Sequence, residues 1–239
     1  MNMWKATILL TVVLTCLISL SLAKNLFQEK TTSINNLEAV AVNEMTNPTQ
    51  DTNIQTDATA SSVNEAREDI PVYEPNQEAL KVYDSALKLY YQRKFYEALP
   101  LFDKALSIDP NCYQALNGKG ATLAFLGKYK EGIDLIKKAQ AINPTFVYAR
   151  FNEGLAYELA GQWNESISAY HEALKLDKND TWSWYGIASV YGRQGNIEKV
   201  LEYLRPAIEL ETDVKAVARE EKDFAPVRND SRFQELVKP

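Results

Sequence analysis

The segment Gly120-Ala121-Thr122-Leu123 is followed 34 residues later by a segment of the same character, Gly154-Leu155-Ala156-Tyr157. Leu126-Gly127-Lys128-Tyr129 is matched at the same offset by Ala160-Gly161-Gln162-Trp163. A constant offset over several positions marks an internal repeat, and periods of about 20–50 residues are typical of repeat architectures. The repeat therefore has to be interpreted before any other motif.

The same offset extends over four copies, with approximate bounds of 79–112, 113–146, 147–180 and 181–214. One position is alanine in every copy, namely Ala105, Ala139, Ala173 and Ala207. Another is the glycine of Gly127, Gly161 and Gly195, which the first copy replaces with Arg93. Equivalent residues of the four copies can therefore be compared position by position.

Each copy contains two runs with helical periodicity. In the first copy, Leu80, Tyr83, Leu87 and Tyr90 recur at intervals of three and four residues, which places them on one helical face. The glycine after such a run suits the left-handed residue that ends a helix. Because one pair of helices cannot bury its apolar face alone, successive pairs must stack on one another.

This pattern resembles the tetratricopeptide repeat (TPR), a 34-residue helix–turn–helix unit. The resemblance implies an all-α fold, a TPR solenoid of four helix–turn–helix repeats in residues 76–214, followed by C-terminal capping helices in residues 215–239. Such an array needs its last apolar face covered. The residues expected to cover it break the period, and they are Phe224, Val227, Phe233 and Leu236.

The periodicity predicts helices over 77–92, 95–108, 112–126, 129–142, 146–160, 163–176, 180–194 and 197–210, with a further helix over 213–221. Asn76 is the expected N-cap of the first helix. Pro100 and Pro206 fall inside second helices, where proline lacks the backbone donor that a helix interior needs. Each should kink its helix or lie at a turn that faces solvent.

Residues 1–23 have the pattern of an export signal, with Lys5 before an apolar run and the small-x-small site Ser21-Leu22-Ala23 at its end. We expect export to the cell envelope, either to the periplasm or by secretion. The alternative is a signal anchor, because residues 6–23 approach the length of a short membrane span and would then tether the protein to the membrane. Lipidation at Cys16 is disfavoured, since Thr15 is not the small residue expected before it.

Residues 24–75 contain three bases, nine acids and no glycine, and few residues that could build a core. This composition predicts a disordered acidic linker rich in Thr and Asn. The remaining residues, 76–239, carry 22 bases and 23 acids and are close to neutral. No nucleic-acid partner is expected, because no basic face is available to neutralise phosphates.

The sequence offers little that could perform catalysis. His171 is the only histidine, and the two cysteines Cys16 and Cys112 form no cluster, so no metal site of the His/Cys type is expected. Gly118-Lys119-Gly120 lacks the further residues of a phosphate-binding loop. We therefore expect a protein that is not an enzyme and has no cofactor and no metal.

In TPR proteins the first helices of successive repeats line a concave groove that holds a peptide or helix of a partner. By register, the residues expected to bind a protein or peptide partner here are Tyr83, Tyr90, Asn117, Phe125, Tyr148, Phe151, Trp182 and Tyr185. Aromatic side chains are enriched at binding hot spots, but about half of this set is expected to pack between helices instead.

Some TPR domains hold chaperone tails through a clamp of Lys, Asn and Arg, and the corresponding positions here contain no base. An apolar or aromatic peptide therefore fits this groove better. The sequence as a whole predicts a non-enzymatic protein–protein interaction scaffold of the cell envelope. The alternatives are a structural TPR protein that self-associates as a homo-oligomer, and a membrane-anchored assembly factor.

Overall fold

A computed structural model describes residues 73–239 of the chain. The predicted export signal, residues 1–23, and all but the end of the predicted linker, residues 24–75, lie outside the described residues. Everything described falls within one unit of the chain, Asp69–Pro239.

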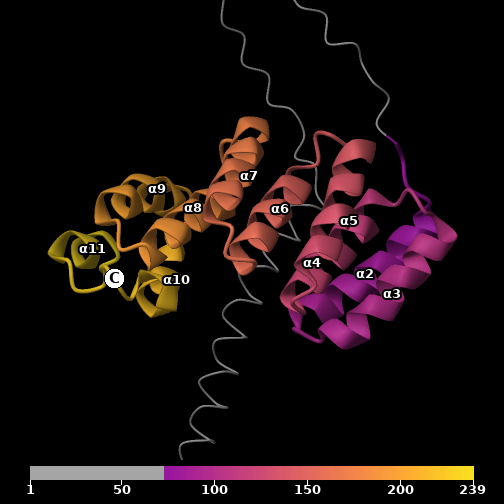
Figure 1. Ribbon diagram of the computed structural model, residues 1–239, viewed down its shortest axis with the longest axis horizontal. Coiled ribbons are helices and arrows are strands. Elements are labelled where there is room, and N and C mark those ends of the chain that lie inside the picture. Colours follow the sequence, from indigo (N-terminus) through magenta and orange to yellow (C-terminus); the bar gives the residue numbers. More distant parts are fainter. Residues whose placement is uncertain (1–72) are drawn as a thin grey trace, which may run out of the picture. The chain divides into compact units, whose positions relative to one another are not determined.

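Eight helices of similar length follow one another along the repeats and are arranged in a row of pairs (Figure 1). They are α2 (Gln77–Tyr91), α3 (Phe95–Ile108), α4 (Tyr113–Phe125), α5 (Tyr129–Ile142), α6 (Val147–Leu159), α7 (Trp163–Leu176), α8 (Thr181–Arg193) and α9 (Ile197–Leu210). Each of them begins and ends within one residue of its predicted bounds. The strongest packing is within the pairs α2–α3, α4–α5, α6–α7 and α8–α9, and each pair also packs on the next. The predicted all-α array of helix–turn–helix repeats is confirmed.

The turn inside each repeat uses the left-handed backbone conformation that the glycine predicted. Gly127, Gly161 and Gly195 have φ values of 79°, 74° and 70°. Arg93 adopts the same conformation in the first repeat, with φ 58°. A left-handed conformation costs a non-glycine residue about 1–2 kcal/mol. The Arg93 guanidinium partly offsets this cost, because it lies 5.5 Å from the centre of the Phe125 ring.

Small residues allow the close helix crossings between repeats. The ring of Tyr170 on α7 is wedged between Gly154 on α6 and Gly186 on α8. A Cβ atom added to either glycine would lie 2.6 Å or 2.5 Å from that ring, which is too close for any real contact. Tyr170 is consequently 1% exposed and is one of the largest buried side chains of the array.

At the N-terminal end of the array, polar residues replace the buried residues of the inner repeats. Ala115 and Thr122 of α4 are buried, whereas the equivalent residues of α2 are Lys81 and Lys88, both exposed. A terminal repeat requires such a polar outer face for solubility. The first helix of the array therefore has no need of another repeat packed on it.

At the other end, three short elements follow α9: α10 (Val214–Glu220), the 3₁₀ helix η1 (Lys222–Phe224) and α11 (Ser231–Leu236). We call these elements the C-terminal cap. Phe224, Val227 and Phe233 are at most 4% exposed in one cluster with Leu204 of α9, and Leu236 packs at its edge, as predicted. Although the cap breaks the sequence pattern, α11 begins 34 residues after the start of α9.

The two prolines inside second helices are accommodated without an interruption of the helix. Pro100 lies in α3 and is exposed, as expected. Pro206 lies in α9 and is half-buried, so the expected solvent-facing turn is found only at Pro100. Among residues 73–239, no helix combines the length and apolar character needed to cross a bilayer.

Candidate interaction surface

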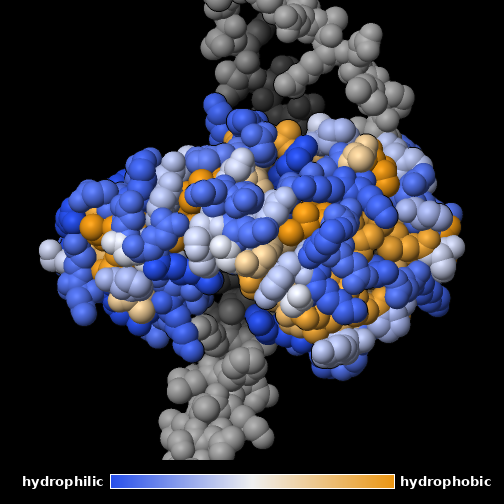
Figure 2. Space-filling model, in the orientation of Figure 1, coloured by the Kyte–Doolittle hydropathy of each residue, from blue (hydrophilic) through white to orange (hydrophobic). Residues whose placement is uncertain are grey.

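The residues predicted to bind a partner come from α2, α4, α6 and α8, which contact one another in this order. We call the side of these helices that carries six of them, all but Tyr90 and Phe125, the first-helix face. Three equivalent positions per helix define it, and their residues are Leu80, Gln114, Tyr148 and Trp182, then Tyr83, Asn117, Phe151 and Tyr185, then Leu87, Ala121, Leu155 and Ser189. None of these twelve residues is charged, and five are aromatic. In the space-filling view, apolar surface is more extensive over the half formed by α2–α5 than over the C-terminal cap (Figure 2).

Tyr148 and Trp182 are the members of this face that reach solvent at the N-terminal ends of α6 and α8. Tyr148 is 40% exposed, and its ring lies 5.7 Å from that of Phe146. Trp182 is half-buried, and its ring lies 5.7 Å from that of Tyr185. These two side chains therefore offer aromatic area to a ligand.

Tyr90 and Phe125 contribute mainly to the contact between the first two repeats. Their rings lie 5.9 Å apart, and Phe125 is stacked on Phe95 at 5.0 Å. Both are half-buried. The sequence placed them correctly on neighbouring first helices, but the structure gives them a packing role as well.

Tyr83 and Asn117 lie deeper on the same face. Burial raises the pKa of the Tyr83 hydroxyl far above its usual range, with smaller contributions from Tyr91 and Asp84. Asn117 is 5% exposed, and its side-chain oxygen has no hydrogen-bond partner among the described residues. Asn117 is therefore part of the floor of the face.

Phe151 and Tyr185 are shielded by neighbours that the repeat pattern did not indicate. The Phe151 ring lies 5.6 Å from Tyr170. The Tyr185 ring lies 5.7 Å from Phe224 of the cap, and burial raises the pKa of its hydroxyl well above the usual range. The cap thus packs over Tyr185 in the fourth-repeat part of the first-helix face.

A polar cluster that the sequence did not single out joins α6, α7, α8 and the cap. Glu158 of α6 is 6% exposed and accepts a hydrogen bond of 2.8 Å from the Tyr170 hydroxyl. Arg193 of α8 bridges Glu158 and Asp223 at 3.1 Å and 2.8 Å, and Ser189 contacts both carboxylates.

The alignment of the four repeats contained one indication of this cluster. Glu158 is the only charged residue at a position where the other copies have Tyr90, Ala124 and Gly192. Such an exception within a row of uncharged residues marks a buried charge that needs partners. The partner Asp223 could not be recognised, because it lies in the segment that breaks the period.

A second buried glutamate, Glu153, lies on the same helix and has different neighbours. It is 8% exposed and accepts a hydrogen bond of 2.7 Å from Gln140. Lys137 and Arg150 approach it to 3.6 Å and 3.8 Å. Two cations therefore compensate this carboxylate at the joint between α5 and α6.

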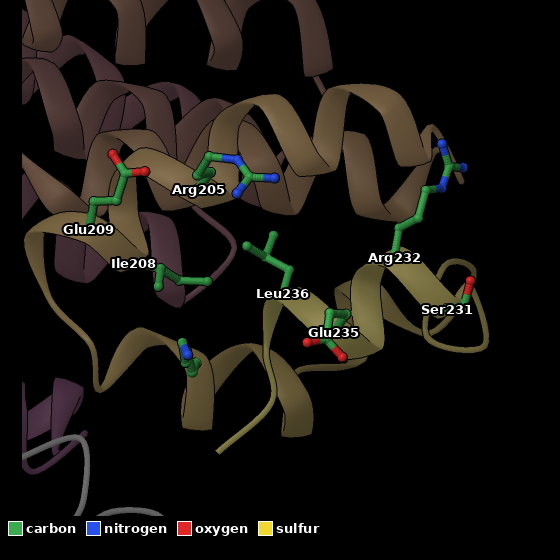
Figure 3. Close-up of a pocket in the computed structure, with 8 residues that line it drawn as sticks. Arg205, Ile208, Glu209, Ser231, Arg232, Glu235 and Leu236 are labelled. Atoms are coloured by element: carbon green, nitrogen blue, oxygen red, sulfur yellow. The ribbon is translucent and has the colours of Figure 1, made fainter.

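The close-up in Figure 3 shows a pocket of about 650 Å³ between α9, α10 and α11. Its walls carry both signs of charge, with Arg205 and Glu209 on α9 and Arg232 and Glu235 on α11, and Ile208 and Leu236 add apolar surface. Arg232 is already paired with Glu198 at 2.6 Å and with Asp230 at 2.9 Å. Charges of both signs in one pocket favour no particular class of ligand.

His171 has no catalytic or metal-binding neighbours in the described part of the chain. Its ring lies 5.6 Å from that of Tyr203 and is half-buried. Burial lowers its pKa, and Lys175 contributes in the same direction. Within residues 73–239, no group of His, Cys, Asp or Glu side chains is placed to hold a metal ion.

Comparison with known families decides the nature of the array. Models of the tetratricopeptide repeat match residues 77–145 and 183–213, and a further TPR repeat model matches residues 154–195. The chain is a TPR repeat protein. Together these matches cover most of the four repeats that the 34-residue period defined, and they leave residues 146–153 unmatched.

One of three similar solved structures supports this fold. A thermophilic TPR protein from Thermus thermophilus is 18% identical, with a TM-score of 0.57, and the match covers 66% of this chain and 86% of that one. MamA from Desulfovibrio magneticus RS-1 is 25% identical, with a TM-score of 0.48 and coverage of 56% and 76%. The first TPR of Spaghetti (RPAP3), solved with an HSP90 peptide, is 21% identical, with a TM-score of 0.44 and coverage of 48% and 91%. No curated protein matches the sequence.

Proposed function

We propose that this TPR protein is a non-enzymatic scaffold that binds an extended peptide of a partner protein on its first-helix face. TPR domains generally mediate protein–protein interactions, which supports the general class. The observation that carries the finer proposal is the absence of charge from all twelve defining positions of the face, together with its five aromatic residues. Aromatic side chains supply large contact area at a low entropic cost.

The chemistry of this face favours a peptide with aromatic or proline residues and few charges. A charged side chain placed on it would lose water without gaining an opposite charge. Aromatic-lined surfaces instead suit proline-rich segments, which are already extended and lose little entropy on binding. The TPR of Spaghetti was solved with an HSP90 peptide. The clamp positions of the present chain hold no base, so we propose a different class of peptide for it.

The test is a selection of random linear peptides, displayed on phage, against the full chain. The matched variants are Tyr148→Ala/Trp182→Ala on the first-helix face and Tyr96→Ala on the opposite layer. Tyr96 is 80% exposed on α3, so it controls for the loss of an exposed aromatic ring. Selected peptides should be poor in acidic residues and should bind the double variant at least about tenfold more weakly, a loss of about 1.4 kcal/mol.

Two results would contradict the proposal. One is that the selected peptides bind the Tyr148→Ala/Trp182→Ala variant as tightly as the wild type while circular dichroism shows unchanged helicity. The other is that an acidic peptide with a free C-terminal carboxylate competes with the selected peptides on equal terms. Binding to the Tyr96→Ala variant should equal binding to the wild type.

We also propose that the scaffold works outside the cytoplasm, on the strength of the signal pattern in residues 1–23. N-terminal sequencing of protein recovered from the native host tests this. A mature chain that starts at Lys24 in a soluble envelope fraction means cleavage and release. An intact Met1 in the membrane fraction means that residues 6–23 remain as an anchor, and an intact Met1 in the cytosol would contradict export.

Self-association by end-to-end stacking is disfavoured by the ends of the array. The outer face of α2 carries Lys81, Asp84 and Lys88, all exposed. The last apolar face is covered by Phe224 and Phe233 of the cap. A concentration-dependent mass in light scattering would reverse this conclusion.

A further inference from the structure

Two carboxylates meet between the third repeat and the C-terminal cap. Oε1 of Glu158 lies 3.1 Å from Ser189 Oγ and 3.1 Å from a terminal nitrogen of Arg193. Oδ2 of Asp223 lies 2.7 Å from the same oxygen and 2.8 Å from the same nitrogen. Two acceptors from distant parts of the chain therefore share the same two partners.

Counting hydrogens shows that this arrangement lacks one. A terminal nitrogen of arginine carries two hydrogens and can donate to both carboxylates. A serine hydroxyl carries one, and the shorter distance assigns it to Asp223. The contact between Ser189 Oγ and Glu158 Oε1 is then a hydrogen bond only if Glu158 supplies the hydrogen.

We propose that Glu158 is a proton-binding residue, and that its proton, donated to Ser189, holds the C-terminal cap closed over the fourth repeat. This inference goes beyond the proposed function, because it concerns the cap and needs no partner.

The surroundings of Glu158 favour a proton on this carboxylate. The Glu158 side chain is 7% exposed, whereas that of Asp223 is 18% exposed, so ionisation of Glu158 costs more solvation energy. Burial raises the pKa of Glu158, and the hydrogen bond from Tyr170, the charge of Arg193 and the hydroxyl of Ser189 only partly oppose it.

The groups that face Glu158 come from three elements. Tyr170 of α7 donates to its other oxygen, Arg193 and Ser189 of α8 contact the first one, and Asp223 of η1 adds a like charge. Arg193 is the one cation in this set, and it is shared between two acids. It also lies 5.5 Å from the centre of the Trp163 ring, which keeps it in place.

The direction of the pH dependence follows from linkage. A carboxyl whose pKa is higher in the closed state than in the open state binds its proton more tightly when the cap is closed. Closure is therefore favoured at low pH, and this contribution is lost as the pH rises through the pKa of Glu158 in the closed state. Since Phe224 covers Tyr185, a loosened cap would lengthen the first-helix face, and this last consequence alone rests on the proposed function.

The first experiment measures the proton directly on the full chain. The ¹³C resonance of the Glu158 carboxyl, assigned through its own backbone, is followed from about pH 5 to about pH 8. We expect it to titrate above the usual range of glutamate. A titration completed within the usual range would overturn the proposal.

The second experiment measures closure by hydrogen exchange, with protection corrected for the intrinsic rate at each pH. Protection of residues 222–237 should fall several-fold from about pH 5 to about pH 8, while α4 stays unchanged. Glu158→Gln supplies a permanent donor, so its cap should stay protected at both pH values. Asp223→Asn, which lacks the like charge, should respond less to pH than the wild type.

Glu153→Gln is the matched control, because it neutralises a buried glutamate of the same helix whose partners Lys137 and Arg150 are cations. It should leave the pH response of the cap intact. The proposal fails if the wild-type cap shows no pH response, or if Glu158→Gln keeps the wild-type response.

Discussion

The two ends of the array differ in how they treat the outer face on which no further repeat packs. At the first end, the outer face of α2 is polar. The carboxylate of Asp109 holds the start of α2 in place, because it accepts hydrogen bonds from the Tyr73 hydroxyl at 2.8 Å and from the backbone N–H of Asn76 at 2.9 Å. At the second end, the apolar face of the last repeat persists and an added segment buries Phe224 and Phe233 against it.

The difference teaches how much each end depends on single residues. A polar outer face is built from many weak contributions, so no single side chain decides it. A cap that buries large aromatic rings concentrates its free energy in a few residues. The second end should therefore be the one that a single substitution can open.

The largest effect is expected at the second end. Phe224 is fully buried and contacts Gly192, Tyr185 and Phe233. Phe224→Ala should lower the free energy of unfolding by about 3–5 kcal/mol through a lost ring and the cavity it leaves. Leu89→Ala, at a half-buried position of α2, should cost only about 1 kcal/mol. Urea denaturation measures both, and similar losses would remove the distinction between the ends.

At the first end, Asp109→Ala should cost about 2 kcal/mol, because a buried carboxylate that accepts charge-assisted hydrogen bonds is lost. Asp109→Asn retains one oxygen and should lose less. Hydrogen exchange should show the loss confined to α2 and the residues before it. Faster exchange in α8 or the cap would mean that the two ends are coupled.

The turn inside the first repeat has Arg93 where the next repeat has Gly127, so substitutions at these two turns should differ in effect. Gly127→Ala should cost about 1 kcal/mol for conformational reasons alone, since an added Cβ would meet nothing within 4 Å. Arg93→Gly should stay within about 0.5 kcal/mol of the wild type, because relief of its left-handed conformation is offset by the lost contact with Phe125. Thermal unfolding distinguishes these outcomes. A clear destabilisation by Arg93→Gly would mean that the ring contact dominates.

The smallest effect is a difference in pH response. Burial would raise the pKa of Asp109, but hydrogen bonds from Asn76, Tyr73 and Asn111 outweigh it, so the pKa lies below its usual value. The contribution of Asp109 to the free energy of unfolding is therefore present above its pKa in the unfolded chain. It is lost as the pH falls through its pKa in the folded protein. Acid should increase exchange in α2, whereas the cap should loosen on the alkaline side. An equal response of both ends to acid would refute this.

The repeats were predictable because equivalent residues meet equivalent neighbours. The spacing of Gly127, Gly161 and Gly195 indicated both the turns and the helix bounds around them. Phe224 was predicted to cover the last face from its position outside the period. Periodicity and the need for a cap were sufficient for this much of the fold.

The exposure of side chains on the candidate surface was less predictable, because it depends on contacts between residues that are not equivalent in the repeats. Tyr148 and Tyr185 belong to the same face, yet one is 40% exposed and the other lies under Phe224. The pairing of Glu158 with Asp223 joins residues far apart in the chain and follows no period. Such contacts depend on how the cap packs on the fourth repeat, and the repeat pattern does not specify this packing.

Because α11 begins one period after the start of α9, the spacing of the repeats continues into the C-terminal cap. The side chains of Asn196 and Asp230, also one period apart, each cap their helix by accepting a backbone amide hydrogen bond. The cap thus occupies the place of a fifth repeat, and its contacts described above all lie with residues 147–214. An extra copy of residues 113–146 spliced in before Val147 would lengthen the molecule by one unit and leave both of its ends with the neighbours they have now.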